Sequence, residues 1–276
     1  MARRVRVTLG FSIVSTAVYT LPDVVVKRYT GESRWKQAKE LHVYSLMADV
    51  PGVPSIVEVD RSCGVTVMTR VPGTPLASAP VEAMGDLYRQ LGSLQAAMHR
   101  VGQPAYGYLT TEVLDPAPTN TAYMTRQFAV KLAEFAERGG SVAIHALASK
   151  CVAERSGLFG SCAGAVVCHN DLHEGNVLVE RAGAGWRVTG FVDVENAVAA
   201  DPLMDLAKTI QYELTRSPVK VAGLLAGYGP LPADGPARIE LYRLYHALEL
   251  WDWFARIGNT GPLDGIAEDI RELASP

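Results

Sequence analysis

The first 70 residues alternate between apolar and polar positions in short runs, a pattern typical of β-strands. One stretch among them, 33–49, instead contains good helix formers, with Ser33 as the expected N-cap and Pro51 and Pro54 beyond the end. The expected strands are 5–10, 16–20, 24–29, 56–59 and 65–69. The order strand, strand, strand, helix, strand, strand predicts one small antiparallel sheet.

The segment VPGTPLASAP, which follows Arg70, changes this pattern, because its prolines and small residues continue neither a strand nor a helix. Beyond it, apolar residues recur at spacings of three and four, as in the run Met84, Leu87, Leu91, Leu94 and Met98. Further helices are expected at 121–138, 141–156, 203–214, 218–227 and 235–257. The strands expected there are 177–180 and 186–192. The chain is therefore predicted to be α+β, with a β lobe at 1–70, a mainly helical lobe at 71–276 and a hinge at 68–75.

Composition narrows the classes of function. A chain of 276 residues with 48% hydrophobic content suits a compact fold, and a net charge of −3 gives no broad attraction for nucleic acid or anionic membranes. Neither partner is expected, and no apolar run approaches the ~20 residues of a membrane span. Polar residues interrupt the apolar stretch near the start, which argues against a signal peptide. The four cysteines show no metal-binding or disulfide spacing, so a cytoplasmic location is expected.

The strongest chemical signal is VVCHNDLHEGNVLVE, in which His169, Asp171 and Asn176 are spaced as H-x-D-x-x-x-x-N. Asp193 follows after a predicted hairpin, in GFVDVENA. Phosphoryl transfer from ATP needs one carboxylate beside the attacking hydroxyl, and an amide oxygen with a second carboxylate to hold magnesium. Asp171 fits the first role, and Asn176 with Asp193 fits the second.

The setting of this motif supports the chemical interpretation. An apolar strand precedes it, VLV follows it, and the hairpin would return Asp193 to the same place. The alternative is structural: Asp171 as a cap, Asn176 as a turn residue and Asp193 as a solvated loop charge. Spacing alone leaves both interpretations open.

The segments HNDLHEGNVLVE and FVDVENAVAADPLMDLAK resemble the aminoglycoside phosphotransferase family, relatives of the protein kinases that phosphorylate antibiotics and small metabolites. The resemblance extends over nearly the whole chain and implies a protein-kinase-like two-lobed fold. It implies that Asp171 is catalytic and that Asn176 and Asp193 bind Mg²⁺. It further implies that His169 braces the catalytic loop and that Asp205 is a buried aspartate that supports this loop.

Lys27 lies within VVVKRY, where burying an unpaired ammonium group would be costly. It resembles the kinase lysine that contacts the ATP phosphates, and Glu40, on the helix that follows, resembles the glutamate that pairs with it. Glu32 is a competing partner. The structural alternative for Lys27 is an exposed lysine on an edge strand.

Two further nucleotide contacts are expected. The first turn, LGFSIVSTAVY, lacks the glycine-rich kinase pattern, so backbone amides near 12–16, with Ser12 or Ser15, are candidate phosphate contacts; a turn without a ligand is the alternative. The connector from Met68 to Val71 matches the segment whose backbone bonds the purine. No side chain there identifies the base, which leaves ATP and GTP both open as phosphoryl donor.

The last long helix carries the expected acceptor site. One of its faces is apolar, and another mixes aromatic and acidic residues. Tyr242, Tyr245, Glu249 and Asp252 are the candidate residues for binding a polar acceptor. A half-exposed polar face without a ligand is the alternative.

The expected function is ATP- and Mg²⁺-dependent phosphorylation of a hydroxyl on a small-molecule antibiotic of aminoglycoside, nucleoside or peptide type, conferring resistance or producer self-resistance. A metabolite kinase acting on a sugar, amino alcohol or amino acid is the rival enzyme. A non-catalytic relative that binds nucleotide or drug is the rival from another class. A protein kinase is disfavoured, because no A-P-E segment follows Asp193.

Overall fold

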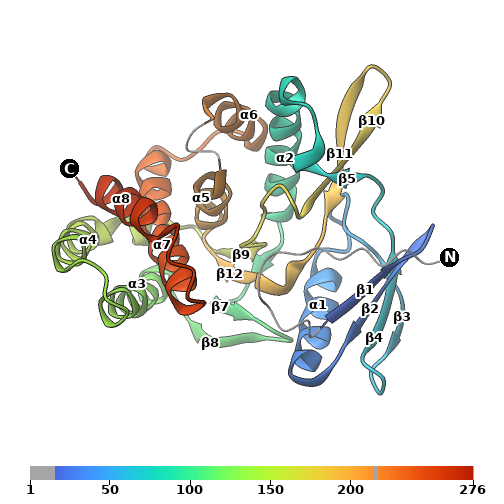
Figure 1. The fold of residues 1–276 in the computed structure, drawn as a ribbon, viewed down its shortest axis with the longest axis horizontal. Coiled ribbons are helices and arrows are strands. Elements are labelled where there is room, and N and C mark those ends of the chain that lie inside the picture. Colours follow the sequence, from blue (N-terminus) through green and yellow to red (C-terminus); the bar gives the residue numbers. More distant parts are fainter. Residues whose placement is uncertain (1–15, 214–216, 276) are drawn as a thin grey trace.

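The computed structural model describes residues 16–213 and 217–275, which form two lobes (Figure 1). The smaller lobe contains one antiparallel sheet, in the strand order β1-β2-β4-β3, and one α-helix. Its elements are β1 (Thr16–Thr20), β2 (Val24–Tyr29), α1 (Arg34–Leu46), β3 (Ile56–Asp60) and β4 (Val65–Thr69). The expected strands between 16 and 69 are thus confirmed, and the expected strand 5–10 lies outside the described residues.

Strand β2 lies inside this sheet, because β1 and β4 pair with it on either side. Its β-branched residues suit such a half-buried position. Lys27 stands opposite Val18 of β1 and Thr66 of β4, and it is 9% exposed. The alternative that made it an exposed lysine on an edge strand is therefore wrong.

The start of α1 differs from the expectation. Ser33 occupies the N-cap position of α1, as expected, but its side chain makes no capping bond to the helix. Its hydroxyl instead donates to the carbonyl oxygen of Thr30 (2.9 Å) and accepts from the Thr30 amide (3.2 Å). These bonds close a 3₁₀ turn, Gly31–Ser33, that leads directly into the helix at Arg34. The predicted N-cap position is therefore confirmed, and the hydroxyl makes no capping bond because this turn already satisfies it.

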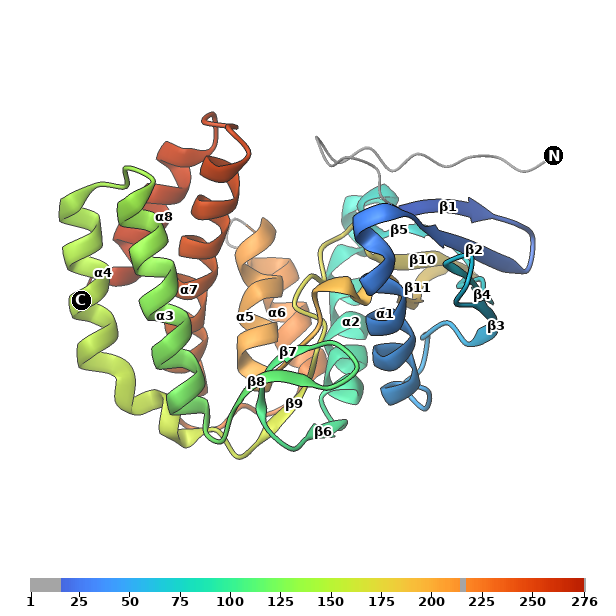
Figure 2. The same cartoon turned by 90° about the horizontal axis from the view of Figure 1, so that it is seen from below.

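The larger lobe is mainly helical (Figure 2). Its α-helices are α2 (Met84–Met98), α3 (Asn120–Glu137), α4 (Val142–Arg155), α5 (Pro202–Glu213), α6 (Pro218–Tyr228), α7 (Gly235–Arg256) and α8 (Leu263–Ala274). Helix α7 packs against α5, α8 and α3, so its apolar and aromatic residues form much of the core of this lobe. None of the described helices is both long enough and apolar enough to cross a bilayer.

Two small antiparallel sheets lie between this helical bundle and the first lobe (Figure 1). Their strands are β5 (Thr74–Pro75), β6 (Gly102–Gln103), β7 (Tyr106–Leu109), β8 (Val113–Ala117), β9 (Ala165–Cys168), β10 (Val177–Ala182), β11 (Gly185–Phe191) and β12 (Val198–Ala200). One sheet has the order β11-β10-β5 and the other β6-β9-β12-β7-β8. The strands β5, β6, β7, β8 and β12 and the helix α8 were not expected from the sequence.

The lobes touch where the loop after α1 meets the end of β11. The Phe191 amide donates to the Gly52 carbonyl oxygen (3.3 Å), and a Cβ atom at Gly190 would lie 1.9 Å from that oxygen. Gly52 has a φ of 74°, and a Cβ atom there would lie 2.5 Å from the Gly190 Cα. Both positions therefore require glycine, and their contact fixes β11 against the first lobe.

Candidate active site

The expected catalytic loop follows β9 and is held by one buried carboxylate. Asp205, on α5, accepts hydrogen bonds from the backbone amides of His169 (3.1 Å) and Asn170 (2.7 Å). Oδ2 of Asp205 also lies 3.0 Å from His99 Nε2, within hydrogen-bond distance. Burial alone would raise the pKa of Asp205, but the hydrogen bond and the charge of His99 outweigh burial and lower this pKa. These bonds hold Asn170 in a left-handed conformation, with a φ of 59°.

His169 joins the catalytic loop to the segment that carries Asp193. Its Nε2 atom lies 3.1 Å from the carbonyl oxygen of Val192, and its ring meets Phe191 edge-on. His169 is fully buried, so its ring is not available for direct contact with a substrate. This position is the one that a bracing role requires.

Asp171 and Asn176 occupy the two ends of the catalytic loop. The Nδ2 group of Asn176 donates to the backbone carbonyl oxygen of Asp171 (2.9 Å). The backbone carbonyl oxygen of Asn176 in turn accepts from the amide of Val192 (2.9 Å). No hydrogen bond among the described residues uses Oδ1 of Asn176, so that oxygen is open to a cation. The Asp171 carboxylate accepts from Asn196 Nδ2 (2.9 Å) and from the Tyr212 hydroxyl (2.5 Å).

Lys27 connects the first lobe to this site. Its Nζ atom lies 2.7 Å from Glu40 Oε2 and 3.7 Å from Asp193 Oδ1. Burial works to lower the pKa of Lys27, but the neighbouring carboxylates of Glu40 and Asp193 outweigh it and raise this pKa, so the ammonium group stays charged. The partner of Lys27 is thus Glu40, whereas the competing Glu32 is exposed.

The residues around Asp193 fit a magnesium ion. Asp193 has a φ of 69°, and its amide donates to the Tyr44 hydroxyl (3.2 Å). One carboxylate oxygen from each of Glu40, Asp193 and Glu195 lies within 4.8 Å of the others. The Asp193 side chain is 44% exposed, so a cation can reach it from solvent. Oxygen ligands of this kind are those that Mg²⁺ prefers.

Helix α1 is bonded directly to the residues after Asp193. Lys36 Nζ pairs with a Glu195 carboxylate oxygen (2.9 Å), and Lys39 Nζ donates to the carbonyl oxygen of Ala197 (3.0 Å). The Lys39 ammonium also lies 3.4 Å from the centre of the Tyr108 ring. Burial lowers the pKa of Lys39 to about 7.

The expected nucleotide contacts fall partly within the described residues. Ser12 and Ser15 lie outside them. Met68 is buried in β4, opposite Val25 and Ile56. The amides of Thr69 and Arg70 are used by carbonyl oxygens of the same lobe, those of Ser55 and Asp23. Within the described chain no backbone hydrogen bond uses the amide of Val71, which makes it the first connector amide that is open to a purine.

The expected acceptor face on α7 requires correction at three positions. Tyr242 is fully buried; its hydroxyl donates to Asp201 (2.6 Å) and accepts from Asn120 (2.8 Å). Tyr245 is buried with its hydroxyl on Gln127 (3.3 Å). Asp252 is buried and paired with Arg138 (2.5 Å). The periodicity was right, but α3 and α5 cover the faces of α7 that carry these side chains.

Glu249 is the exception on this helix. Its side chain is partly exposed, and it pairs with Lys208 of α5 and with His246 Nδ1 (3.2 Å). The Lys208 ammonium lies 5.5 Å from the centre of the Tyr212 ring, whose hydroxyl reaches Asp171. Glu249 thus lies two side chains away from the expected catalytic carboxylate.

The sequence of this chain matches one family of known proteins. The sequence model of the phosphotransferase enzyme family matches residues 12–242, which is most of the chain. The protein belongs to this family. No curated protein sequence matches the chain.

Many solved structures share the fold of this phosphotransferase, and three of them illustrate the range. A thermostable mutant of the aminoglycoside phosphotransferase APH(4)-Ia, in a complex with AMP-PNP and hygromycin B, is 14% identical, with a TM-score of 0.70 over 96% of this chain and 92% of the other. A choline/ethanolamine kinase family protein from Mesorhizobium loti is 18% identical, with 0.68 over 100% and 88%. A fructosamine-3-kinase homologue from Thermobifida fusca is 20% identical, with 0.68 over 99% and 93%. The protein-kinase-like two-lobed α+β fold is therefore confirmed.

Asn196 and Tyr212, which both contact Asp171, were not expected from the sequence. Asn196 lies three residues after Asp193, in a 3₁₀ turn, Val194–Asn196, whose geometry the sequence did not reveal. Tyr212 follows Asp205 by two helical turns, so both side chains lie on one side of α5, toward the catalytic loop. That spacing is a signal that could have identified Tyr212.

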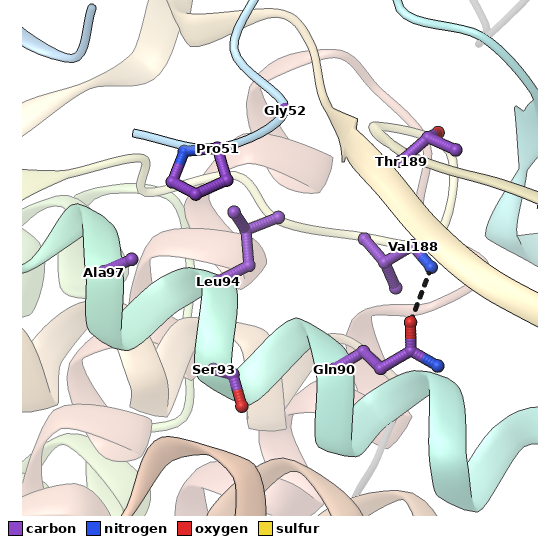
Figure 3. A pocket seen from close by; sticks show the side chains of 8 residues that line it. All are labelled: Pro51, Gly52, Gln90, Ser93, Leu94, Ala97, Val188 and Thr189. Atoms are coloured by element: carbon purple, nitrogen blue, oxygen red, sulfur yellow. Dashed lines mark hydrogen bonds between the residues drawn. The ribbon is translucent and has the colours of Figure 1, made fainter. Parts of the chain in front are cut away.

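The phosphotransferase also has a surface cavity of about 250 Å³ outside this site. It is lined by Pro51, Gly52, Gln90, Ser93, Leu94, Ala97, Val188 and Thr189 (Figure 3). Its most polar wall residue, Gln90, is already used: Oε1 accepts from the Val188 amide (2.9 Å) and Nε2 donates to the Trp186 carbonyl oxygen (3.1 Å). No expected site residue lines this cavity.

Proposed function

We propose that this protein transfers the γ-phosphoryl group of ATP to a hydroxyl group of a small molecule. The observation that carries the proposal is the meeting of three segments at one place. Lys27 of β2 lies 3.7 Å from Asp193, and Asp171 is bonded to Asn196 of the same loop as Asp193. A fixed cation, a metal-binding carboxylate and a carboxylate for the acceptor hydroxyl are the parts that this reaction needs.

Each residue has a stated task in this reaction. Asp171 orients the acceptor hydroxyl and takes its proton as the oxygen attacks phosphorus. Lys27, held by Glu40, binds the phosphates. Asn176 and Asp193 hold Mg²⁺, which neutralises charge on the phosphates when it is bound. His169 and Asp205 keep the catalytic loop in its conformation.

The lobes divide these tasks. In this proposal residues 1–70 form the nucleotide-binding lobe, with Ser12 and Ser15 as further contacts, and 71–276 form the catalytic and acceptor-binding lobe. Met68 is buried between Val25 and Ile56, so the connector contact moves from Met68 to Val71. The amide of Val71 faces the purine from the hinge. Solved relatives include one complex with AMP-PNP and another with GDP and kanamycin, so ATP is proposed as the donor and GTP is the competing nucleotide. Both ATP and GTP are present in the cytoplasm, which is the proposed location.

We infer that the acceptor is an antibiotic that bears a free hydroxyl, and that it carries few positive charges. Aminoglycosides are polycations and need unpaired carboxylates as partners. Around this site Glu249 pairs with Lys208 and Glu174 pairs with Lys220. These ion pairs favour a nucleoside or weakly charged peptide antibiotic over an aminoglycoside. Glu249, with its partner Lys208, is the part of the expected acceptor site that this proposal retains.

A metabolite kinase is the second candidate. Its support is that the choline/ethanolamine kinase family protein and the fructosamine-3-kinase homologue match the fold as closely as the antibiotic kinase does. A non-catalytic relative is disfavoured, because Lys27, Asp171, Asn176 and Asp193 are all present and close together.

The test is ADP release with Mg²⁺, ATP and a panel of neutral nucleoside antibiotics, peptide antibiotics, aminoglycosides, sugars and amino alcohols. The control is Asp171→Asn, which keeps the size of the side chain and removes its charge. We expect kcat to fall by about 10²-fold or more, the usual range for losing a positioned base, with nearly unchanged calorimetric affinity for a non-hydrolysable ATP analogue. Wild-type kcat in this variant would refute the assignment, and a parallel loss of nucleotide binding would make Asp171 a structural or metal-binding residue. Turnover of aminoglycosides alone would refute the charge argument.

A further inference from the structure

Both carboxylate oxygens of Asp171 already have a hydrogen-bond donor. Oδ2 accepts from Asn196 Nδ2 at 2.9 Å, and Oδ1 accepts from the Tyr212 hydroxyl at 2.5 Å. A base must receive the proton of the attacking hydroxyl through such a hydrogen bond. An incoming acceptor therefore has to share or replace one of these two donors.

The two donors differ in how they are held. Asn196 belongs to the loop that carries Asp193, and its own carbonyl oxygen accepts from Asn170 Nδ2 (3.3 Å), so it is fixed between the metal-binding and catalytic loops. Tyr212 approaches from α5, a helix of the larger lobe that packs beside β9 (Figure 1). Asn196 belongs to the segment after Asp193, whose carboxylate lies 3.7 Å from Lys27. Under the proposed function the phosphates bind on that side of Asp171, so the acceptor would approach from the Tyr212 side.

The Tyr212 hydroxyl acts as a hydrogen-bond donor to Asp171. Burial and the charge of Asp171 raise the pKa of Tyr212, so its hydroxyl keeps its proton at neutral pH. Its ring meets His173 edge-on, with centroids 5.8 Å apart, and lies below the Lys208 ammonium. His173 and Lys208 thus flank the ring, and its hydroxyl contacts the Asp171 carboxylate.

We propose that the Tyr212 hydroxyl occupies the place of the acceptor hydroxyl and keeps water from Asp171 until an acceptor displaces it. Tyr212 is then a positioning residue that limits wasteful hydrolysis of ATP. The inference rests on the proposed kinase function and adds a property that this function does not require.

The reaction that Tyr212 would prevent is hydrolysis of ATP by water. A water molecule beside Asp171 would give one proton to the carboxylate while its oxygen bonds to the γ-phosphorus. The bond from that phosphorus to the β,γ-bridging oxygen would break, which yields ADP and inorganic phosphate. No further reactant is needed.

The test is ATP hydrolysis by the full chain, with Mg²⁺ and without any acceptor, in wild type and in Tyr212→Phe. The change removes one oxygen atom and leaves room for a water molecule beside Oδ1. We expect inorganic phosphate release to rise by about tenfold, a modest share of the roughly 10²- to 10⁴-fold that a positioned base contributes. Affinity for a non-hydrolysable ATP analogue, measured by calorimetry, should stay the same. The matched control is Tyr106→Phe, which removes a buried phenol hydroxyl bonded to Cys162 and should change neither quantity.

A second measurement does not depend on turnover. In the proton NMR spectrum of the wild-type protein without ligands, a hydroxyl proton bonded to Asp171 should give a low-field resonance that Tyr212→Phe lacks and Tyr106→Phe keeps. Absence of that resonance from wild type, or hydrolysis that stays level or falls in Tyr212→Phe while the analogue still binds, would overturn this inference alone. Failure of wild type to bind the analogue would overturn the proposed function as well.

Discussion

The carboxylate of Asp205 offers the sharpest test of what holds the catalytic loop. In Asp205→Asn the side chain keeps its shape, but it loses its charge and presents an NH₂ group to donors. Wild-type Asp205 accepts from two backbone amides, of His169 and Asn170, and from the His99 ring. Bonds to a charged group contribute about 1.5–3 kcal/mol each, and a buried unsatisfied donor costs about 1–3 kcal/mol. The loss of one such bond and one such conflict gives an expected destabilisation of about 3–5 kcal/mol.

Urea denaturation of wild type and variant measures this loss, and a thermal scan should show a Tm lower by roughly 6–10 °C, taking about 2 °C per kcal/mol for a large domain. The control is Asp49→Asn, at an exposed position. An Asp205→Asn protein within about 0.5 kcal/mol of wild type, the usual range for surface changes, would refute the reasoning.

The same residue sets a pH dependence. The folded pKa of Asp205 lies below its ordinary value, so the folded state holds this proton less tightly than the unfolded chain does. The stability that Asp205 contributes is present above the unfolded pKa, about 3.9, and is lost as the pH falls through the folded value. Between pH 5 and pH 3, wild type should therefore lose more stability than Asp205→Asn. Parallel curves for the two proteins would contradict the pKa shift.

Three further variants test the rest of the site. Asp193→Ala should abolish turnover with the unfolding free energy nearly unchanged, since this carboxylate is half-exposed; retained turnover with unaltered Mg²⁺ dependence would count against the metal assignment. Lys27→Met should raise the KM for ATP more than that for the acceptor, measured by steady-state kinetics, and equal effects would separate Lys27 from the phosphates. Gly52→Ala should destabilise the protein by about 2 kcal/mol or more in urea denaturation, because its Cβ would meet Gly190; a stable variant would show that the lobes can shift apart.

Much of the fold followed from periodicity. The long helices and the strands of the first lobe carry repeated apolar positions, and the structure has them within a few residues of the expected bounds. The missed strands are short, whereas the missed helix α8 spans Leu263–Ala274. Strand β12 has three residues, Val198–Ala200, and β5 has two, so neither has a period that a sequence can display. These strands form because β7, β9 and β10 already provide pairing edges.

Some residues of the candidate site were likewise predictable from the sequence, and others were not. The residues of the H-x-D-x-x-x-x-N motif and Asp193 were found because their spacing along the chain is itself the signal. The acceptor face failed at Tyr242 and Asp252 because a helical wheel distinguishes faces and does not reveal which neighbour covers each of them. Contacts between distant segments, such as Lys39 with Ala197, have no local signature at all.

The bonds between α1 and the segment after Asp193 have a consequence for how the cell could govern this protein. Only residues 194–201 separate Asp193 from α5, and Lys36 and Lys39 tie that short segment to α1. Within the described segment 194–201 there is no long loop whose phosphorylation could reposition α1, and the Lys27–Glu40 pair is already formed. The proposed function therefore needs no ordering step in this segment before Lys27 and Glu40 pair. Under that proposal, output would follow the number of copies synthesised and the supply of acceptor.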